Sequence, residues 1–417
     1  MDAVWVTSVE VDLIRHRLEQ PLVLSKGTVI HLPEVTVRLG MSNGADHATG
    51  LGAVNLSDAW AWPDPEQTSA AKQEAMVDYC HLLADTLLAR VGDPAHPLEL
   101  GMRLHDSALG DDHHQLPALA RAVCASAFDA ALHDAAGHLT RSSAFAFYTE
   151  PAEIPSIDHH FPHGAVAAIG NVLQTPTSTL PGWWLIVPGD DLDRTADQVT
   201  RTGMTRFKIK LSGADPSGDA RQVFTMHRAM SQAVASPRLS IDTNEGSASP
   251  EAVSRFLDEL EKLSPEAYGA VTYLEQPTAR GTLAEHSWAE IGARVPVLVD
   301  EALTSMADLE TARQQGWSGF AIKTCKGHSF ALAAAAWAAI HDLPITVQDL
   351  TNIGRSAIHS FLLAAHLPTT NGIELNSVQY LPSANRPWLP RLSGLFAPTN
   401  GLHTLDPAGV IGLGSQL

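Results

Sequence analysis

Two lysines stand two residues apart in the stretch "TRFKIKL", residues 205–211. In an extended strand, alternate side chains point to the same face, so Lys208 and Lys210 share one face while the apolar residues between and beside them share the other. An edge strand with a solvated polar face would show the same pattern. A pair of neighbouring ammonium groups can also hold a carboxylate or exchange a proton with a substrate.

Acidic residues end three later apolar segments that have the character of strands. Asp242 closes "LSID", Glu275 lies in "VTYLEQ", and Asp300 with Glu301 ends "VPVLVDE", while Lys323 ends "GFAIK". Three carboxylates brought together without a counter-ion raise one another's pKa, and a divalent cation removes that cost. Oxygen ligands favour a hard ion, so we expect Mg²⁺ at Asp242, Glu275 and Asp300. The alternative is a buried ion network with the lysines alone, which is a poor source of stability.

A cation flanked by lysines has a definite use in catalysis. If a substrate carboxylate binds Mg²⁺, removal of its α-proton gives an enediolate whose charge the metal stabilises. Lys210 suits the role of base, because a neighbouring ammonium and the metal disfavour its charged form. We expect Lys208 to supply that charge and hold the carboxylate, and Lys323 to address the opposite face of the same carbon.

Eight short apolar runs alternate with amphipathic segments from residue 183 onward. Strands alternating with helices indicate a parallel sheet, and eight units in this length suit a (β/α)₈ barrel, whose chemistry lies at the carboxyl ends of its strands. A doubly wound sheet is the competing architecture, but "IVPGDDLDR" lacks the glycine-rich phosphate turn. The predicted strands are "WWLIV" at 183, "RFKIKL" at 206, "LSID" at 239, "VTYLEQ" at 271, "VPVLVDE" at 295, "GFAIK" at 319, "PITVQDL" at 344 and "GIELNS" at 372.

The remainder of the chain divides into three parts. Residues 1–140 combine strand patterns with helical ones such as "PALARAVCASAFDAALHDAAGHL" and predict an α+β domain. Residues 141–182 have no clear period and predict a long loop into the barrel, which we place at 183–375. Residues 376–417 are rich in proline and glycine and predict an irregular tail that packs back on the first domain.

Composition narrows the class of protein. The 417-residue chain has a formal net charge of -19, which disfavours nucleic-acid binding. No apolar run approaches the roughly 20 residues of a membrane span, and the first residues read as a strand with no export signal, so we expect a cytoplasmic protein. Cys80, Cys124 and Cys325 are an odd, widely spaced set that suits reduced thiols.

Taken together, these residues resemble the enolase superfamily, and within it the muconate lactonizing enzyme-like subgroup of the mandelate racemase/muconate lactonizing enzyme family. The matching pieces are "FKIK", "SIDTN", "YLEQP", "VLVDEALTS" and "FAIKTCKG", in the family's order, and "AFDAALHDAAGHL" is similar to its capping-domain helix. The resemblance implies a modified TIM-type barrel under an N-terminal capping domain, with Mg²⁺ on the three acids and an acid/base pair of lysines. Assembly as a homo-oligomer is implied by the same analogy.

The same resemblance suggests further candidate site residues. A histidine partner at the seventh strand and an Asp-x-Asp at the eighth are absent, which argues against a Lys/His pair and against a dipeptide substrate. Lys323 and Lys326 both follow the sixth strand, and alternation from Ala321 favours Lys323 as the inward lysine. Candidates for supporting the ligands or contacting substrate are Asn244, Glu301, Lys326, Gln348, Asp349 and Glu374. Two loops of the first domain offer Ser25, Lys26, Thr28, Trp60 and Trp62 for specificity, although the two tryptophans equally suit packing on their own domain.

Several functions stay open at this point. Two lysines on opposite faces favour a racemase or epimerase of an amino-acid derivative or related acid, and they also permit a cycloisomerase or a β-eliminating dehydratase. A Schiff-base aldolase using Lys323 and a non-catalytic binding barrel are also compatible with the sequence. The histidines of "DHHFPH", His159, His160 and His163, could bind a transition metal but are more typical of a solvated loop.

Overall fold

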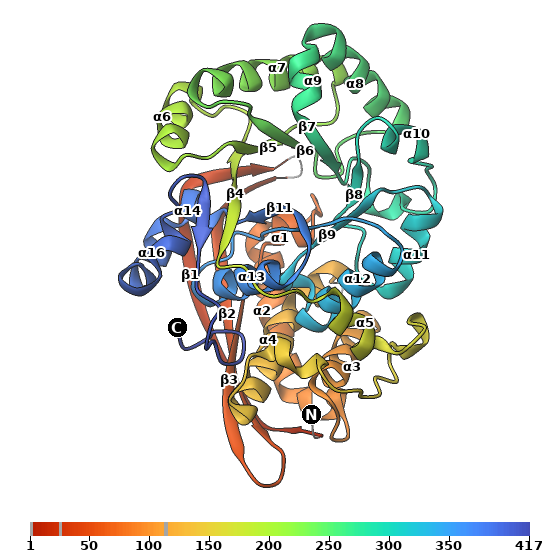
Figure 1. The fold of residues 1–417 in the computed structure, drawn as a ribbon, viewed down its shortest axis with the longest axis vertical. Helices are drawn as coiled ribbons and strands as arrows, with labels where there is room; N and C mark the ends of the chain where they lie inside the picture. The colour runs from red at the N-terminus through yellow and green to blue at the C-terminus, as the bar shows by residue number, and fades with distance from the viewer. Residues whose placement is uncertain (1–2, 25–26, 112–115) are drawn as a thin grey trace.

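The computed structural model describes residues 3–24, 27–111 and 116–417 (Figure 1). Its first part is an antiparallel sheet of β1 (Trp5–Leu24), β2 (Gly27–Ser42) and β3 (His47–Asn55), in that order. The hairpin of β1 and β2 is long, and its far half extends along the barrel. There Leu22 and Val29 pack with Leu185 of the barrel, so this hairpin reaches the carboxyl end of a barrel strand.

Two long helices, α2 (Ser69–Val91) and α4 (Ala118–Thr140), pack against the sheet, and α3 (Pro97–Leu109) packs on both of them. Of these three helices, α4 is the one that packs on β3. It lies so close to this strand that two glycines are required at the contact. A Cβ on Gly50 would lie 2.1 Å from the backbone nitrogen of Ala135, and one on Gly52 would lie 2.0 Å from the carbonyl oxygen of Ala127. The glycines therefore allow the backbone of β3 to touch the backbone of α4.

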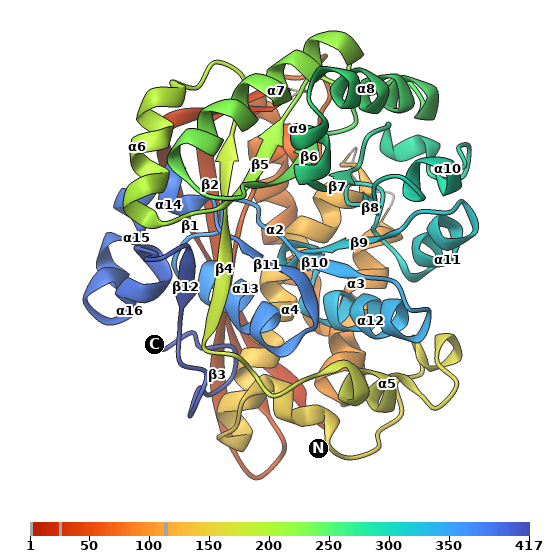
Figure 2. The same cartoon turned by 45° about the horizontal axis from the view of Figure 1, so that its top comes forward.

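The second part is a closed barrel of eight parallel strands (Figure 2). All eight predicted strands are present, and the barrel closes because the last strand pairs with the first through Ile373 and Gly182. The prediction of a (β/α)₈ barrel with an N-terminal α+β domain is confirmed. The strands are β4 (Thr179–Ile186), β5 (Arg206–Lys210), β6 (Arg238–Asp242), β7 (Val271–Glu275), β8 (Val297–Val299), β9 (Gly319–Ile322), β10 (Ile345–Val347) and β11 (Thr369–Glu374).

Helices surround this barrel on its outer side. Helix α8 shows why they form: Ser249 caps its first turn, Pro250 stands at the first position, and Val253, Phe256, Leu257 and Leu260 make an apolar stripe that is buried. The outer helices are α6 (Leu192–Thr202), α7 (Pro216–Ala233), α8 (Pro250–Leu263), α9 (Pro265–Ala270), α10 (Ala289–Gly292), α11 (Met306–Gln314), α12 (His328–Ile340) and α13 (Gly354–His366).

The prediction of a long loop at 141–182 is wrong for part of its length. The segment holds 3₁₀ turns at Ala144–Tyr148 and Asp158–His160 and the helix α5 (Ala165–Val172). One carboxylate organises it, since Asp158 accepts the backbone N–H of Ile154 at 2.7 Å and that of Ala165 at 2.8 Å. The apolar residues of α5 pack against α12, and a helix of two turns is too short to show a clear period in the sequence.

The C-terminal segment is more regular than the irregular tail expected from its composition. It contains α14 (Ser377–Tyr380), α15 (Pro382–Asn385), a 3₁₀ turn at Arg386–Trp388, α16 (Leu389–Phe396) and β12 (Leu402–Thr404). Strand β12 pairs antiparallel with β4, so part of the segment extends the barrel sheet. The end returns to the first domain, where Asp134 of α4 accepts hydrogen bonds from the Leu413 N–H and the Ser415 hydroxyl. Within the described ranges no helix is long and apolar enough to cross a bilayer, and the cytoplasmic location stays a prediction.

Candidate active site

The candidate catalytic residues lie at the carboxyl ends of neighbouring barrel strands. Lys210 of β5 stands beside Asp242 of β6, which in turn stands beside Glu275 of β7. Asp300 follows β8 directly and Lys323 follows β9. All are buried. Successive side chains of a strand point to opposite faces, so the apolar residues face the outer helices and these polar side chains face the barrel mouth.

Lys208 is at the centre of the contacts. Its Nζ lies 3.0 Å from Asp242 Oδ2, 2.8 Å from Glu275 Oε1 and 3.1 Å from Glu374 Oε2. Burial lowers the pKa of Lys208, but the carboxylates of Glu275, Glu374 and Asp242 outweigh burial and raise that pKa well above its usual range. Lys208 is therefore held as an ammonium ion that joins three strand ends.

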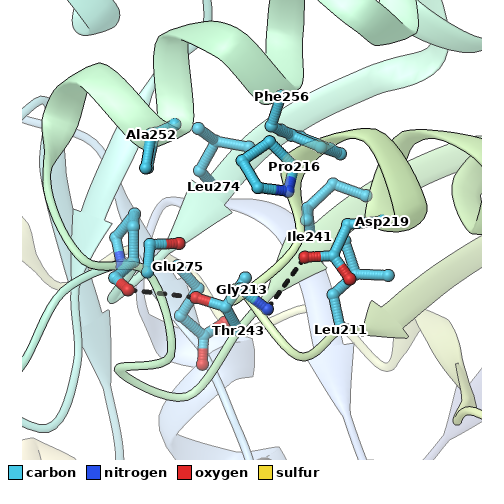
Figure 3. A pocket seen from close by; sticks show the side chains of 13 residues that line it. Leu211, Gly213, Pro216, Asp219, Ile241, Thr243, Ala252, Phe256, Leu274 and Glu275 are labelled. Carbon is cyan, nitrogen blue, oxygen red and sulfur yellow. Dashed lines mark hydrogen bonds between the residues drawn. The ribbon is translucent and has the colours of Figure 1, made fainter.

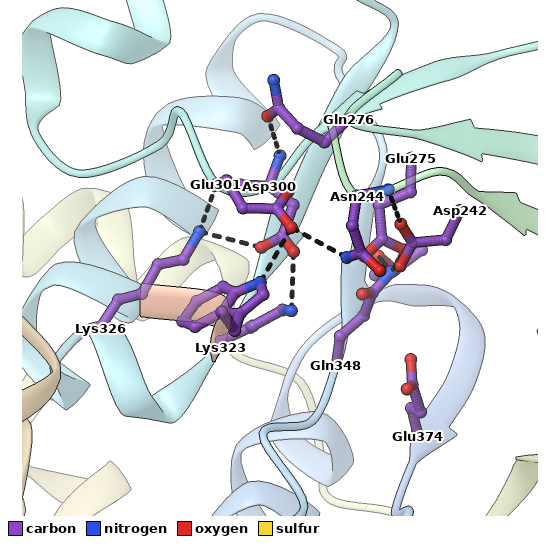
Figure 4. Close-up of polar contacts among 12 residues, drawn as sticks. Asp242, Asn244, Glu275, Gln276, Asp300, Glu301, Lys323, Lys326, Gln348 and Glu374 are labelled. Carbon is purple, nitrogen blue, oxygen red and sulfur yellow. Dashed lines mark hydrogen bonds and ion pairs between the residues drawn. The ribbon is translucent and has the colours of Figure 1, made fainter. Parts of the chain in front are cut away.

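The other lysines each contact one acid. Lys210 Nζ lies 2.5 Å from Asp242 Oδ2, and Lys323 Nζ lies 2.7 Å from Asp300 Oδ2. Lys326 Nζ bonds the backbone oxygen of Asp300 and lies 3.1 Å from its Oδ1 (Figure 4). Burial raises the pKa of Asp300, but Lys323 and Lys326 outweigh burial and hold that pKa well below its usual value. Lys210 with Asp242 and the two later lysines with Asp300 thus form two separate lysine–carboxylate groups, and the direct contacts of Lys208 are on the Asp242 side.

Acids outnumber lysines in this cluster, which we call the acid–lysine cluster. Six buried carboxylates face four buried lysines, so two negative charges are in excess when every member is ionised. Its members are Asp242, Glu275, Asp300, Glu301, Asp349 and Glu374, with Lys208, Lys210, Lys323 and Lys326.

The excess shows in the titration of single groups. Burial, Asp242 and Asp300 raise the pKa of Glu275 well above its usual value. Burial and Asp300 raise the pKa of Glu301 to about 7, and burial and Glu374 raise the pKa of Asp349 to about 7. The protein's own lysines therefore leave part of the acid charge uncompensated.

A divalent cation fits this donor set in charge and in chemistry. The donors are carboxylate oxygens, which suit Mg²⁺, and Glu301 Oε2 is buried without a hydrogen-bond partner among the described residues. Across the described ranges no three Asp, Glu, His or Cys side chains are already arranged to hold a metal, because the lysines occupy carboxylate oxygens. Asp242, Glu275 and Asp300 are the carboxylates that would hold such a cation, and its charge would offset the excess of acid in the cluster.

The remaining predicted residues support this cluster. Gln348 Nε2 donates to Glu275 Oε2 at 2.6 Å, and its Oε1 accepts from Lys208 at 3.0 Å. Asn244 donates its backbone N–H to Asp242 Oδ1 at 2.7 Å and its side-chain Nδ2 to Glu301 Oε1 at 3.0 Å.

On the far side of the mouth, Asn376 connects the last two acids of the cluster. Its backbone N–H donates to Asp349 Oδ2, and its Nδ2 donates to Glu374 Oε1 at 2.7 Å. The structure thus brings together all the residues that were named from the sequence as supporting the ligands or contacting substrate.

A small cavity of about 30 Å³ opens beside the cluster. Lys210 and Lys323 both line it, from strands on opposite sides of the barrel, whereas Lys326 does not. Its apolar wall comes from both domains and comprises Leu22, Leu24, Trp60, Leu185 and Leu350. A second cavity, of about 20 Å³, lies on the outer side of β5, β6 and β7 under α7 and α8, and none of the four lysines lines it (Figure 3).

The predicted specificity residues separate into different places. Trp60 and Trp62 are both buried in the same apolar cluster, but only Trp60 of the two lines the cavity. Thr28 is exposed and does not line the cavity, and Ser25 and Lys26 lie outside the described residues. His159 and His163 are exposed and His160 is half-buried, in and beside a 3₁₀ turn outside the acid–lysine cluster.

Comparison with known proteins places this arrangement in a family. Residues 191–390, which hold seven of the eight barrel strands, match the family described as enolase C-terminal domain-like. The barrel of this chain belongs to that family. No curated protein matches this sequence.

Solved structures share the fold over almost the whole of this chain. A muconate lactonizing enzyme from Pseudomonas fluorescens complexed with muconolactone aligns with a TM-score of 0.69 at 19% identity, covering 99% of this chain and 96% of that one. A dipeptide epimerase from Enterococcus faecalis complexed with Mg and L-Leu-L-Tyr aligns with a TM-score of 0.69 at 16% identity, covering 98% and 99%. An enolase from Bradyrhizobium complexed with magnesium and mandelic acid gives 0.66 at 17%, covering 99% and 96%. At these identities the likeness is one of fold.

Two residues that support this site, Gln276 and Arg280, were not singled out from the sequence. Gln276, in the quoted "YLEQP", accepts the backbone N–H groups of Asp300 and Ala302 at 2.9 and 3.1 Å and so fixes the turn after β8. Arg280 binds Glu245 through two contacts, at 2.9 and 2.7 Å, and joins the barrel to the first domain. Gln276 could have been found from its place in the motif "YLEQP". Arg280 could not, because its contact with the backbone oxygen of Trp60 forms only where the two domains meet.

Proposed function

We propose that this chain is a Mg²⁺-dependent enzyme that removes the α-proton of a small carboxylate, most simply as a racemase or epimerase of an amino-acid derivative or related acid. One observation carries the proposal. Lys210 and Lys323 stand half-way round the barrel from one another and line the same cavity beside the acid–lysine cluster. A substrate carbon between them would present one face to each lysine.

Each residue has a distinct part in this proposal. Asp242, Glu275 and Asp300 would hold Mg²⁺, which when bound supplies positive charge to the substrate carboxylate and lowers the cost of the enediolate. Lys210 removes or returns the proton on one face, and Lys323 does so on the other. Lys208, which already contacts three carboxylates, keeps the strand ends together and offers charge to the substrate.

The domains have separate tasks in the proposed enzyme. We assign residues 1–140 to a capping domain, 141–182 to the connection, 183–375 to the barrel and 376–417 to a segment that packs back on the capping domain. The barrel carries the lysines and acids, while the hairpin of β1 and β2 brings Leu22 and Leu24 to the cavity wall and α1 (Asp58–Ala61) brings Trp60. Substrate choice would therefore rest on the capping domain, and proton transfer on the barrel.

The test is incorporation of deuterium at the α-carbon. The protein is incubated in D₂O with Mg²⁺ and pooled N-acylated, N-methylated and hydroxylated carboxylic acids, and mass shifts are measured. Exchange that EDTA abolishes, and that Lys210→Ala and Lys323→Ala remove from opposite faces, is the expected result. Lys262→Ala is the matched control, because that lysine is exposed on α8.

Different products distinguish the competing reactions within the same experiment. Loss of a β-group from the substrate identifies a dehydratase, and formation of a ring product that carries one solvent deuterium at its α-carbon identifies a cycloisomerase. Trapping of a carbonyl substrate on Lys323 by borohydride would identify a Schiff-base aldolase instead. If no acid in the pool exchanges, eliminates or cyclises, the proposed α-proton chemistry is wrong.

A further inference from the structure

Trp60 is the one residue of the capping domain whose side chain contacts the acid–lysine cluster by both its N–H and its ring, among the described residues. Its indole Nε1 donates to Glu301 Oε1 at 2.9 Å. Its ring face lies 4.5 Å from Lys323 Nζ and 5.8 Å from Lys326 Nζ, measured to the ring centroid. Figure 4 shows the lysines and Glu301 converging on this side of the mouth.

The contact distinguishes the two candidate proton-transfer lysines. Lys323 and Trp60 line the cavity together, so the ring covers one side of the ammonium group while another side stays open to substrate. In the described part of the chain, no ring face contacts Lys208 or Lys210 at comparable range. Any contribution from the ring therefore falls on the face of the substrate that Lys323 serves.

Polar groups of both domains hold the short helix that carries Trp60. From the barrel, Arg280 Nη2 donates to the backbone oxygen of Trp60 at 3.0 Å, and Glu245 fixes the guanidinium. From the capping domain, Lys72 Nζ donates to the backbone oxygen of Trp62 at 2.9 Å and lies 3.4 Å from Asp58 Oδ2.

A four-residue helix cannot hold a side chain in place by itself. These polar contacts hold the backbone around Trp60 in addition to the apolar packing of its side chain. Trp62, two residues further on, is buried in the same apolar cluster as Trp60, but among the described residues it neither lines the cavity nor contacts a lysine by its ring.

We propose that Trp60 is a positioning residue for Lys323: its ring keeps water from one side of the ammonium group and directs Nζ toward the cavity, and its N–H holds Glu301 beside Asp300. This rests on the proposed function for the role of Lys323. The capping domain then takes part in proton transfer as well as in substrate choice. Because a desolvated cation–ring contact is worth about 2 kcal/mol, loss of the ring changes the Lys323 step by about 30-fold.

The first test needs no substrate. The full-length protein with Mg²⁺ is trace-labelled with acetic anhydride, and the rate at each lysine is read by peptide mass spectrometry against exposed Lys262. Trp60→Leu is expected to raise the rate at Lys323 at least several-fold and to leave Lys210 unchanged. Trp60→Phe keeps a ring and is expected to stay near wild type, and Trp62→Leu controls for general loosening of the domain.

The second test uses an acid that exchanges in the wild-type protein. Trp60→Leu is expected to slow exchange on the face served by Lys323 by about 30-fold and to change the other face by less than about two-fold. Equal loss on both faces, or labelling that rises at Lys210 and Lys323 together, would overturn the inference and leave Trp60 a packing residue. Failure of the wild-type protein to exchange any acid counts against the proposed function, while the labelling result still decides the contact of Trp60 with Lys323.

Discussion

His403 gives a sharp test of the electrostatics of the folded chain, away from the acid–lysine cluster. It lies in β12, fully buried, with Nδ1 2.7 Å from the carbonyl oxygen of Leu395 and Nε2 without a hydrogen-bond partner among the described residues. Burial lowers its pKa to about 4 and outweighs the hydrogen bond to Leu395, which acts in the opposite direction. The folded chain therefore keeps this imidazole neutral where an unfolded chain, with a pKa of about 6.5, begins to protonate it.

The sign and size of the effect on stability follow from that difference. Because the unfolded chain binds the proton first, the stabilising effect of neutral His403 is fully present above about pH 6.5 and is lost as the pH falls towards 4. Each pKa unit corresponds to about 1.4 kcal/mol, so a fall from pH 7 to pH 5 costs about 2 kcal/mol of unfolding free energy through this residue.

The assay compares wild type with His403→Gln by urea denaturation at pH 7 and pH 5. The variant has a lower stability at pH 7, since it disturbs a packed site, but it is expected to lose about 2 kcal/mol less between the two pH values. Contributions from other titrating groups cancel in this difference. His81→Gln, which removes an exposed histidine of α2, is the matched control. Equal pH dependence of wild type and His403→Gln would refute the reasoning.

Three further predictions concern packing, order and metal. Gly52→Ala places a Cβ 2.0 Å from the backbone oxygen of Ala127 and is expected to lower the free energy of unfolding, measured with denaturant, by about 3 kcal/mol. The control Gly281→Ala, whose Cβ would stand in open space, is expected to lower it by less than about 0.5 kcal/mol, and equal losses would contradict the contact. Asp158→Ala removes the acceptor of two backbone N–H groups, which lowers the free energy of local opening by about 1 kcal/mol or more. The rate of amide hydrogen exchange over 154–165 is therefore expected to rise at least about five-fold, and an unchanged rate would show that the carboxylate does not order the segment. Mg²⁺ at 100 times its Kd is expected to raise the unfolding free energy by about 2.7 kcal/mol, reversibly with EDTA; a response that persists in Asp300→Ala would place the cation elsewhere.

Much of the fold and most of the site could be predicted from the sequence for one physical reason. Parallel strands present their carboxyl ends at a single edge, so an ordered series of acids and lysines at strand ends already describes a three-dimensional cluster. Lys208, Asp242 and Glu275 follow from this reasoning without any knowledge of helix packing, and the structure brings them together. The roles assigned to these residues stay proposals until turnover is measured.

The features that could not be predicted depend on contacts between distant parts of the chain. Helix α5 is stabilised by packing on α12, and its own two turns carry little periodic signal. The separation of Trp60 from Trp62 depends on how α1 sits between the domains, since both have the same residue type and nearly the same burial. Arg280 and Glu245 are ordinary loop residues in the sequence, and their importance arises from the backbone oxygen of Trp60 that they reach.

Closure of the barrel has a consequence for the order in which this protein can assemble. β4 is flanked by β11, through Ile373 and Gly182, and by β12, so both of its late neighbours come from the last 50 residues of the chain. During synthesis, β4 and β10 must wait with open hydrogen-bonding edges until those residues leave the ribosome, and open edges promote aggregation. A nascent chain stalled before Thr369 thus leaves both edges unpaired, and synthesis of β11 is the event that allows the active-site ring to close.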